Sequence, residues 1–364
     1  MHHARLLIGK LFVLPVVTNS LLYLVSITFT FSTETFAAQN QFWDLCRHSG
    51  SRHLHCDSIR KICSQVANVK IPPQDKPTDQ EKLLLKGCSS DKLYYGYGNT
   101  SDPINARKCA FMQVEQNNAD GVFDGTPILM TVYANGEGVK RDLDIALKFA
   151  CDDESHAAAE FEGRVEHILQ MKHETRQQRF DYCEDITSGY MSGICANRQA
   201  SLDNALREIQ YTRLFSKWST GEKRSFEKMQ FPWKSYLKAR EAEIDQSGTD
   251  RGAMIIADQE LLKKKFLSDL SDYEEGKMPK FSEHDSKRVD QELNFIYKKI
   301  QGGKENQVSG TVTRENIKLA QRAWLKYRDA WLVFAKLKYP AVSEAAWNTK
   351  LTRDRVELLK EFIN

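Results

Sequence analysis

Cysteine and histidine are concentrated in the segment that follows residue 40. Imidazole nitrogen and thiolate sulfur are ligands that zinc takes in proteins, so a zinc site is one interpretation. The spacing fits no standard zinc finger, and in an oxidising compartment the same cysteines would bond to one another. The disulfide interpretation is favoured, and no metal is predicted. The residues concerned are His48, His53, His55, Cys46, Cys56 and Cys63.

No other group of residues has the spacing of an active site. The sequence contains no Ser-His-Asp set, no phosphate-binding loop and no G-x-S-x-G element, and no pair of carboxylates stands out as acid and base. His156, His167 and His173 lie among charged residues and are expected on solvated helix faces. Asn99-Thr-Ser101 matches a glycosylation acceptor. We therefore predict a protein that is not an enzyme and takes no cofactor.

The first residues have the layout of a secretory signal peptide. Arg5 and Lys10 form a basic region, an apolar run covers residues 11–31, and small residues follow near position 38. An uncleaved membrane anchor is the alternative, because the run is long enough to span a bilayer. We predict a signal peptide over residues 1–38, secretion to the periplasm or beyond, and no stable membrane insertion after cleavage.

All the cysteines follow that predicted cleavage site. An even number in an exported protein indicates disulfides, but eight cysteines allow 105 pairings. The first part of the chain is expected to need covalent bridges, and the part after residue 195 is expected to fold without them. The cysteines are Cys46, Cys56, Cys63, Cys88, Cys109, Cys151, Cys183 and Cys195.

The overall composition is that of a globular, mostly helical protein. A chain of 364 residues is long enough for two or three domains. It is 41% hydrophobic and 28% charged, with only nine prolines. The net charge of +3 gives no reason to expect a nucleic-acid partner.

A pattern G-x-G-x3-D-x3-A occurs twice, 40 residues apart. The glycines permit positive φ where the chain reverses, and the aspartate can cap the next helix. Periods near 40 residues with paired helices are typical of helical solenoids. The repeat-turn positions are Gly96, Gly98 and Asp102 in the first copy and Gly136, Gly138 and Asp142 in the second.

The second copy resembles a Sel-one-like repeat, a relative of the tetratricopeptide repeat. Residues 133–146 read Y-A-N-G-E-G-V-K-R-D-L-D-I-A. The first copy is degenerate and lacks the valine after its second glycine. The resemblance covers about residues 82–150 and implies a helical scaffold that holds other proteins, without catalysis.

A longer internal repeat relates two parts of the C-terminal half at an offset of 91 residues. It also sets Leu202 on Leu293 and Ile209 on Ile300. The repeat predicts two copies of one helical unit, each with a helix, a long helix and a final helix. Its clearest members are Gln230, Trp233 and Tyr236, which recur as Gln321, Trp324 and Tyr327.

The second copy resembles the N-terminal domain of the lysozyme inhibitor LprI family. The elements are Q-R-x-W-x3-R-D-A over residues 321–330 and L-T-x2-R over residues 351–355. The first copy matches more weakly. The resemblance implies a protein that binds and inhibits a lysozyme-type hydrolase. The motif residues are Gln321, Trp324, Tyr327, Arg328, Asp329, Leu351, Thr352 and Arg355.

The family resemblance also implies roles for single residues. In the first copy, Cys183 and Cys195 stand where family members carry cysteines, and we predict that they pair. The motif of the second copy could form a recognition surface, but helical spacing favours Trp324 and Tyr327 in the core. Arg328 could instead bridge to a carboxylate on another helix, and Arg355 could do the same.

We therefore predict an all-α protein with a helical, solenoid-like N-terminal region and two tandem small helical bundles. Its partner is expected to be a lysozyme-type hydrolase or another envelope protein. A scaffold for envelope proteins is the alternative function. The predicted segments are 1–38 (signal peptide), 39–77 (Cys/His-rich), 78–175 (Sel-one-like repeats), 180–273 (first LprI-like unit) and 281–364 (second LprI-like unit).

Overall fold

The computed structural model describes residues 41–48, 55–116, 121–153, 157–175 and 178–363. These residues form 14 α-helices, two short 3-10 helices and one two-stranded sheet, so the predicted all-α fold is correct. They fall within one compact unit that begins at Ala38. The predicted signal peptide lies outside the described residues. Within the described ranges, no helix has both the length and the apolar character that a membrane crossing requires.

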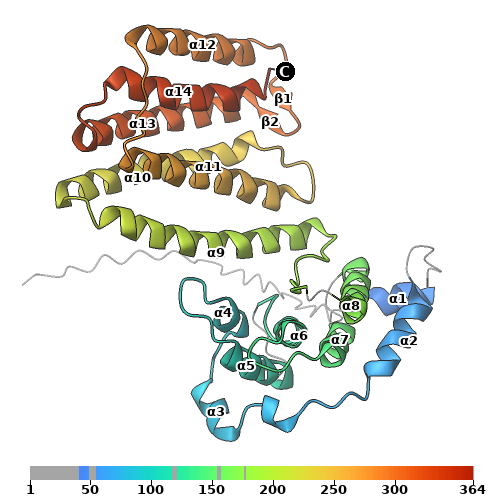
Figure 1. Cartoon of the computed structure of the whole chain (residues 1–364). Helices are drawn as coiled ribbons and strands as arrows, with labels where there is room; N and C mark the ends of the chain where they lie inside the picture. Colours follow the sequence, from blue (N-terminus) through green and yellow to red (C-terminus); the bar gives the residue numbers. More distant parts are fainter. Residues whose placement is uncertain (1–40, 49–54, 117–120, 154–156, 176–177, 364) are drawn as a thin grey trace, which may run out of the picture. The chain divides into compact units, whose positions relative to one another are not determined.

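The N-terminal half contains eight α-helices and one 3-10 helix in the described ranges, shown in blue to green in Figure 1. They are α1 (Gln41–His48), α2 (Cys56–Val66), η1 (Pro73–Asp75), α3 (Asp79–Leu84), α4 (Ser90–Tyr95), α5 (Pro103–Gln116), α6 (Thr126–Asn135), α7 (Leu143–Asp152) and α8 (Ala158–His173).

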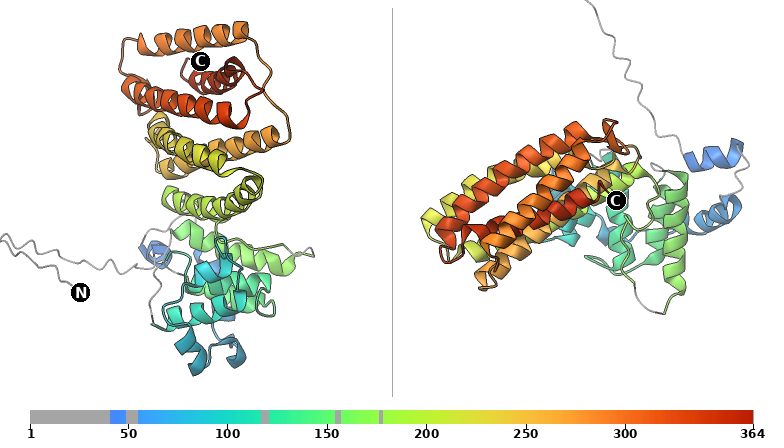
Figure 2. Two further views of the ribbon diagram at one scale, coloured as in Figure 1. Left: turned by 90° about the vertical axis from the view of Figure 1, so that its left-hand side faces the viewer. Right: turned by 90° about the horizontal axis from the view of Figure 1, so that it is seen from above.

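The C-terminal half contains longer helices, which run roughly side by side in Figure 2. They are α9 (Gly189–Phe215), α10 (Thr220–Arg240), η2 (Glu241–Glu243), α11 (Arg251–Glu274), α12 (Glu283–Gln301), α13 (Arg314–Lys338) and α14 (Glu344–Lys360), with strands β1 (Gln307–Ser309) and β2 (Val312–Thr313) between α12 and α13.

The two turns of the N-terminal repeat have the same backbone geometry. Their four glycines all have positive φ, between 70° and 97°. The amide of Asp102 donates to the carbonyl of Leu93, and 40 residues later the amide of Asp142 donates to the carbonyl of Tyr133. Both turns therefore return the chain in the same way, between α4 and α5 and between α6 and α7.

The aspartates of these turns cap the helices that follow. The Asp142 carboxylate accepts from the amides of Asp144 and Ile145 at 3.0 and 3.1 Å, and Asp102 accepts from the amide of Asn105 at 3.0 Å. Such caps satisfy amides that have no partner within the helix. The assignment of this region to the Sel-one-like family stays a prediction.

Four disulfides hold the N-terminal core, and all eight cysteines take part in them. The Cys183–Cys195 bridge is among them, with 5.9 Å between the Cα atoms. It forms because α9 begins only at Gly189, so Cys183 lies in the turn before the helix. The other three bridges are Cys46–Cys56, Cys63–Cys151 and Cys88–Cys109.

Two apolar cores share helix α9. Met191 and Cys195 at its start belong to the N-terminal core. Tyr211 and Phe215 near its end pack against the C-terminal core. One continuous helix of 27 residues therefore connects a disulfide-bonded core to a core without disulfides.

The helices of the C-terminal core pair in a regular way. Helix α10 packs on α13, α9 on α11, and α12 on α14. The first and third helices of each predicted unit thus contact each other, and the two middle helices pair across the units. This pattern supports two related units, and the tandem assignment stays a prediction.

The internal repeat with an offset of 91 residues pairs residues of similar burial in the middle helices, α10 and α13, but not in the first helices, α9 and α12. Ile300 on α12 is 5% exposed, whereas its expected counterpart Ile209 on α9 is 46% exposed. Helix α9 instead buries Arg207, which makes an ion pair of 2.5 Å with Glu260 on α11. Ile209 and Ile300 therefore differ in burial, and the equivalence of the two positions stays a prediction.

Candidate functional site

The aromatic motif residues of both units lie inside the C-terminal core. Trp233, Tyr236, Trp324 and Tyr327 are all buried. The rings of Tyr236 and Tyr327 are stacked, with 6.0 Å between centroids and 3° between planes. These side chains serve as packing between α10 and α13 and are not accessible to a partner.

Arg355 is the centre of a buried polar cluster. Its guanidinium donates to both carboxylate oxygens of Glu243, at 2.6 and 2.8 Å, and to the side-chain oxygen of Gln321 at 2.8 Å. Arg240 also donates to Glu243, at 2.9 Å, and to Asp258 on α11. The cluster joins η2, α10, α11, α13 and α14, so these motif residues have a structural role.

The remaining motif residues lie at the edge of this core or within it. Among the described residues, Arg328 contacts no carboxylate on another helix, so the alternative that it bridges two helices is wrong. It contacts the neighbouring Asp329 at 3.0 Å and lies over the Trp324 ring. Gln230 is half-buried, and Leu351 and Thr352 are buried in α14.

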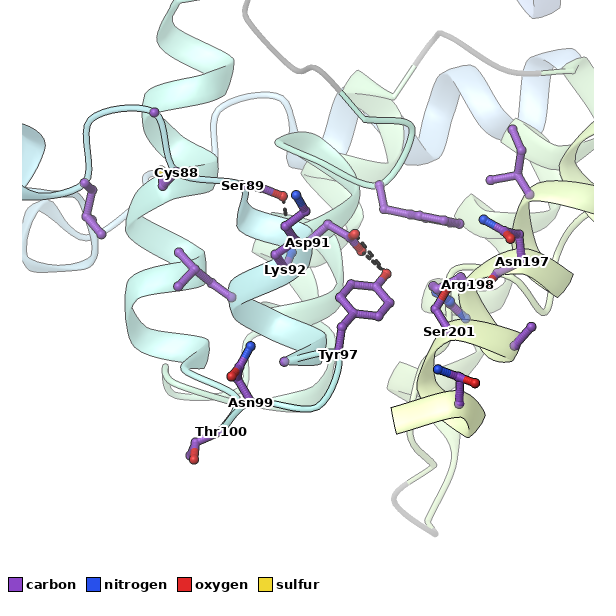
Figure 3. A pocket seen from close by; sticks show the side chains of 18 of the residues that line it. Cys88, Ser89, Asp91, Lys92, Tyr97, Asn99, Thr100, Asn197, Arg198 and Ser201 are labelled. Atoms are coloured by element: carbon purple, nitrogen blue, oxygen red, sulfur yellow. Dashed lines mark hydrogen bonds between the residues drawn. The ribbon is translucent and has the colours of Figure 1, made fainter. Parts of the chain in front are cut away.

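A large cleft between α4 and α9, with a volume of about 1000 Å³, is lined by both polar and apolar side chains. Figure 3 shows the two walls, with Asp91, Lys92 and Tyr97 facing Asn197, Arg198 and Ser201. One wall is the segment 84–100, and the other is the face of α9 from 194 to 204. Glu260 and Lys263 of α11 complete the lining.

Asp91 and Tyr97 form one side of this cleft. The Tyr97 hydroxyl donates to the Asp91 carboxylate at 2.9 Å. Burial, together with the nearby Asp124 carboxylate, raises the pKa of Asp91, against the lowering effect of the Tyr97 hydrogen bond. Tyr97 has a φ of 42°, between two glycines of positive φ. This turn thus places a strained residue with a fixed side chain at the cleft.

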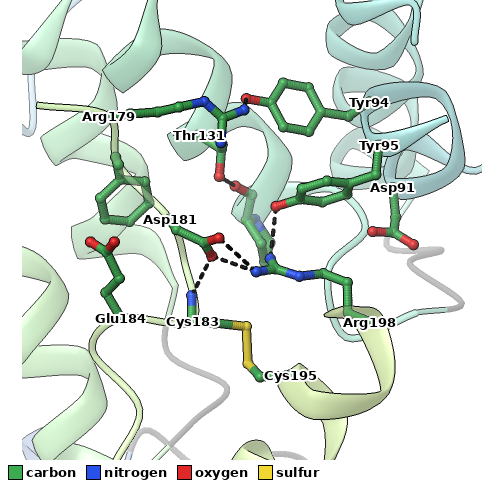
Figure 4. Close-up of polar contacts among 12 residues, drawn as sticks. Asp91, Tyr94, Tyr95, Thr131, Arg179, Asp181, Cys183, Glu184, Cys195 and Arg198 are labelled. Carbon is green, nitrogen blue, oxygen red and sulfur yellow. Dashed lines mark hydrogen bonds and ion pairs between the residues drawn. A yellow bond between two sulfur atoms is a disulfide. The ribbon is translucent and has the colours of Figure 1, made fainter. Parts of the chain in front are cut away.

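Arg198 forms the base of the opposite wall (Figure 4). It donates to the Tyr95 hydroxyl at 2.7 Å and to both oxygens of Asp181 at 2.6 and 2.8 Å. The amide of Cys183, in the Cys183–Cys195 bridge, donates to the same Asp181 carboxylate at 2.9 Å. The disulfide and the ion pair together fix the start of α9 relative to α4.

The spacing of these cleft residues in the sequence does not indicate a site. Asp91 and Arg198 are more than a hundred residues apart, and each alone resembles an ordinary helix residue. The available signal was local: Arg198 follows Cys195 by one turn, and Tyr97 stands between Gly96 and Gly98. A tyrosine between two turn glycines is a position of unusual backbone geometry.

The cysteines of the N-terminal segment cannot supply thiolate ligands to zinc, because Cys46, Cys56 and Cys63 are all in disulfides. The His55 ring nitrogen Nδ1 lies 3.0 Å from Glu162 and 3.2 Å from Glu166. His55 and Glu166 are exposed, and these contacts are ordinary hydrogen-bonding distances. His53 and the His48 side chain lie outside the described residues.

The segment between α12 and α13 is an exposed β-hairpin. Its two strands pair antiparallel with one irregular step. The Thr311 amide donates to Asp245 at 2.9 Å, and the Thr311 hydroxyl accepts from the Gln246 amide at 2.7 Å. The hydrogen bond from the Thr311 amide, together with those from Ser247, lowers the pKa of Asp245. The hairpin is thereby held against the loop after η2.

Together these features define a mostly helical protein with a disulfide-bonded N-terminal core, a cleft between α4 and α9 and an exposed C-terminal hairpin. Residues 268–359 match the family model described as Lysozyme inhibitor LprI. The matched segment runs from the end of α11 through α14 and includes the hairpin. No curated protein and no solved structure matches the chain. The match points to a protein partner, and the four disulfides are typical of an extracytoplasmic compartment.

Proposed function

We propose that this protein is exported to the cell envelope, where it binds and inhibits a lysozyme-type cell-wall glycosidase. The observation that carries the proposal is the match of residues 268–359 to the lysozyme inhibitor family. The four disulfides support export, because such bridges persist in oxidising compartments.

The hairpin is the element of the matched segment that we propose as the contact. Residues 302–307 and 309–311 are exposed, and the clamp by Asp245 limits the conformational freedom that binding would remove. A rigid exposed loop can enter a substrate cleft without reorganisation.

The charge of the hairpin suits such a cleft. Lys304 at the exposed bend makes no ion pair with any residue in the described ranges. Lys299 and Arg314 line the same hollow beside it, so three basic side chains there face one acidic side chain, Glu305. Glycosidases of this kind act through two carboxylates that flank the scissile bond. We propose that Lys304 is placed to approach those carboxylates.

Muramidase inhibition by the mature protein tests the function. We expect the wild-type protein to inhibit, and the Lys304→Glu variant to inhibit at least tenfold more weakly, because it replaces attraction by repulsion. Lys280→Glu is the matched control. Lys280 is also exposed and lies before α12, so the 19 residues of that helix, roughly 28 Å, separate it from the hairpin.

The outcomes separate the function from the proposed contact. Absence of inhibition by wild-type protein at high micromolar concentration would reject the function. Equal inhibition by wild type and Lys304→Glu would retain the function and reject the hairpin as the contact.

A scaffold that holds other envelope proteins through its N-terminal repeats is the second candidate function. The cleft beside α4 favours it, because one wall of the cleft belongs to the repeat region and the cleft lies outside the segment matched to the inhibitor family. Capture of an envelope protein by the wild type, lost when the cleft is altered and kept when the hairpin is altered, would support it.

A further inference from the structure

We infer that the cleft between α4 and α9 is a binding site for an extended peptide segment with acidic side chains. The inference does not rest on glycosidase inhibition, because the cleft lies outside the segment matched to the inhibitor family.

The dimensions of the cleft suit a short extended segment. The lining of α9 runs from Ile194 to Asn204, a rise of ten residues, which corresponds to about 15 Å at 1.5 Å per residue. An extended chain advances about 3.3 Å per residue. Four or five residues can therefore lie along α9 within the 1000 Å³ of the cleft.

Three carboxamides line the cleft with their hydrogen-bonding groups free. Asn197 and Asn204 lie seven residues apart on one face of α9, and Asn99 lies on the opposite wall. No hydrogen bond joins their side-chain amides to another described residue, and all three are exposed. A carboxamide donates and accepts at once, so it can pair with a peptide group of the ligand backbone.

The charges of the cleft leave a positive surplus. Its lining contains four basic and two acidic side chains, a difference of two. Arg198 is paired with Asp181, and Glu260 is shared between Arg207 and Lys263. The Asp91 carboxylate accepts from the neutral Tyr97 hydroxyl, so it keeps its negative charge and interacts electrostatically with Lys92.

The basic side chains of the lining that make no ion pair among the described residues are Lys86 and Lys92, and both are exposed. They lie on the wall formed by segment 84–100, opposite α9. This surplus favours a ligand with carboxylates over a neutral glycan.

The apolar part of the lining suits the alternation of an extended chain. Leu93, Phe123 and Ile194 line the cleft beneath the polar groups, and Leu84 at its rim is 78% exposed. Successive side chains of an extended peptide point to opposite sides. Acidic residues can therefore face the lysines while alternate apolar residues face the floor.

Both walls of the cleft are held by disulfides before any ligand arrives. Cys88 in one wall is bonded to Cys109, and Cys195 in α9 is bonded to Cys183. Fluorescence anisotropy with the oxidised full-length mature protein tests such a preformed site. The probes are a labelled octapeptide of alternating glutamate and leucine, its lysine–leucine counterpart, and a labelled N-acetylglucosamine oligosaccharide.

We expect the acidic peptide to bind, with an affinity that falls as salt is added, and the basic peptide to bind at least tenfold more weakly. The Asn197→Ala/Asn204→Ala variant should lose about tenfold in affinity, the effect of two lost hydrogen bonds. Asn294→Ala, at an exposed position of α12, should leave binding unchanged. Lys86→Glu/Lys92→Glu should lower the affinity for the acidic peptide and not the affinity for the basic peptide.

Four results would each overturn the inference: no binding of the acidic peptide at high micromolar concentration, equal affinity for both peptides, binding of the oligosaccharide alone, or an unchanged affinity in both cleft variants. Circular dichroism of each variant checks that the helices are retained.

Discussion

Arg355 and Glu243 are joined by two hydrogen bonds of 2.6 and 2.8 Å, and both side chains are completely buried. Arg355 belongs to α14, and Glu243 ends the 3-10 helix that follows α10. The pair therefore links the two predicted LprI-like units at a point that water does not reach.

Removal of one partner of this pair should destabilise the C-terminal core severely. Arg355→Ala leaves the Glu243 carboxylate with only Arg240 in an apolar interior, and the expected loss is about 3–5 kcal/mol. Urea unfolding followed by tryptophan fluorescence measures it. Arg288→Ala removes an exposed pair with Asp285 and should cost less than about 1 kcal/mol. Equal losses in the two variants would contradict a structural role for the buried pair.

The repeat turn at Gly138 should be intolerant of any side chain. Gly138 has a φ of 70°, and an added Cβ would lie 2.6 Å from the carbonyl carbon of Pro103. Gly87 has a φ of 73° but nothing within 4 Å of that position. Gly87→Ala should therefore show only the cost of positive φ, about 1–2 kcal/mol, and Gly138→Ala a clearly larger loss. Thermal melts of the two variants make the comparison, and indistinguishable melting temperatures would refute the close approach.

The disulfides should differ in their contribution according to the loops that they close. The Cys63–Cys151 bridge spans 88 residues and Cys183–Cys195 spans 12. Loop-closure entropy assigns them about 4.6 and about 2.8 kcal/mol. Replacement of each pair by serine should therefore lower the melting temperature of the N-terminal core more for the longer loop. A reversed order would show that native contacts, and not chain entropy, decide the ranking.

The ion pair of His167 with Asp185 should make stability depend on pH. The Asp185 carboxylate accepts from the His167 ring at 2.9 Å and raises the pKa of His167 above its ordinary value of 6.5. A raised folded-state pKa gives a stabilisation that is complete below about pH 6.5 and is lost as the pH rises through the folded-state pKa.

The melting temperature of His167→Gln should thus fall below that of the wild type at pH 5.5 by more than at pH 8.5. His173→Gln, at an exposed position on the same helix, serves as the control. A difference between wild type and His167→Gln that is the same at both pH values would argue against the ion pair.

The predictions from sequence were confirmed where a local backbone or helix geometry requires a particular type of residue. Gly136 and Gly138 were expected in a chain reversal and have positive φ there. The spacing of Trp324 and Tyr327 was expected on one helix face, and both are buried. In each case the residue types and their spacing within a short segment are enough to predict the observed geometry.

Prediction from sequence failed where either of two faces of one helix could be the buried face. The offset of 91 residues set Leu202 and Ile209 on Leu293 and Ile300, which are buried, yet Ile209 is exposed and α9 buries Arg207 against Glu260. The apolar pattern of α9 is too weak to show which face is covered, and only the partner helix decides it. The cleft was not predicted for a related reason. Its walls come from segments about a hundred residues apart, and no sequence pattern indicates that they lie side by side.

The bridges are unevenly distributed along the chain, and this gives the molecule a chemical asymmetry. Every sulfur–sulfur bond lies before residue 196, whereas the segment that matches the inhibitor family has none. A thiol reagent therefore acts on only one half of this protein. Under such treatment the walls beside Cys88 and Cys195 lose their covalent restraint, while the helices that carry the hairpin keep every contact on which their folding depends.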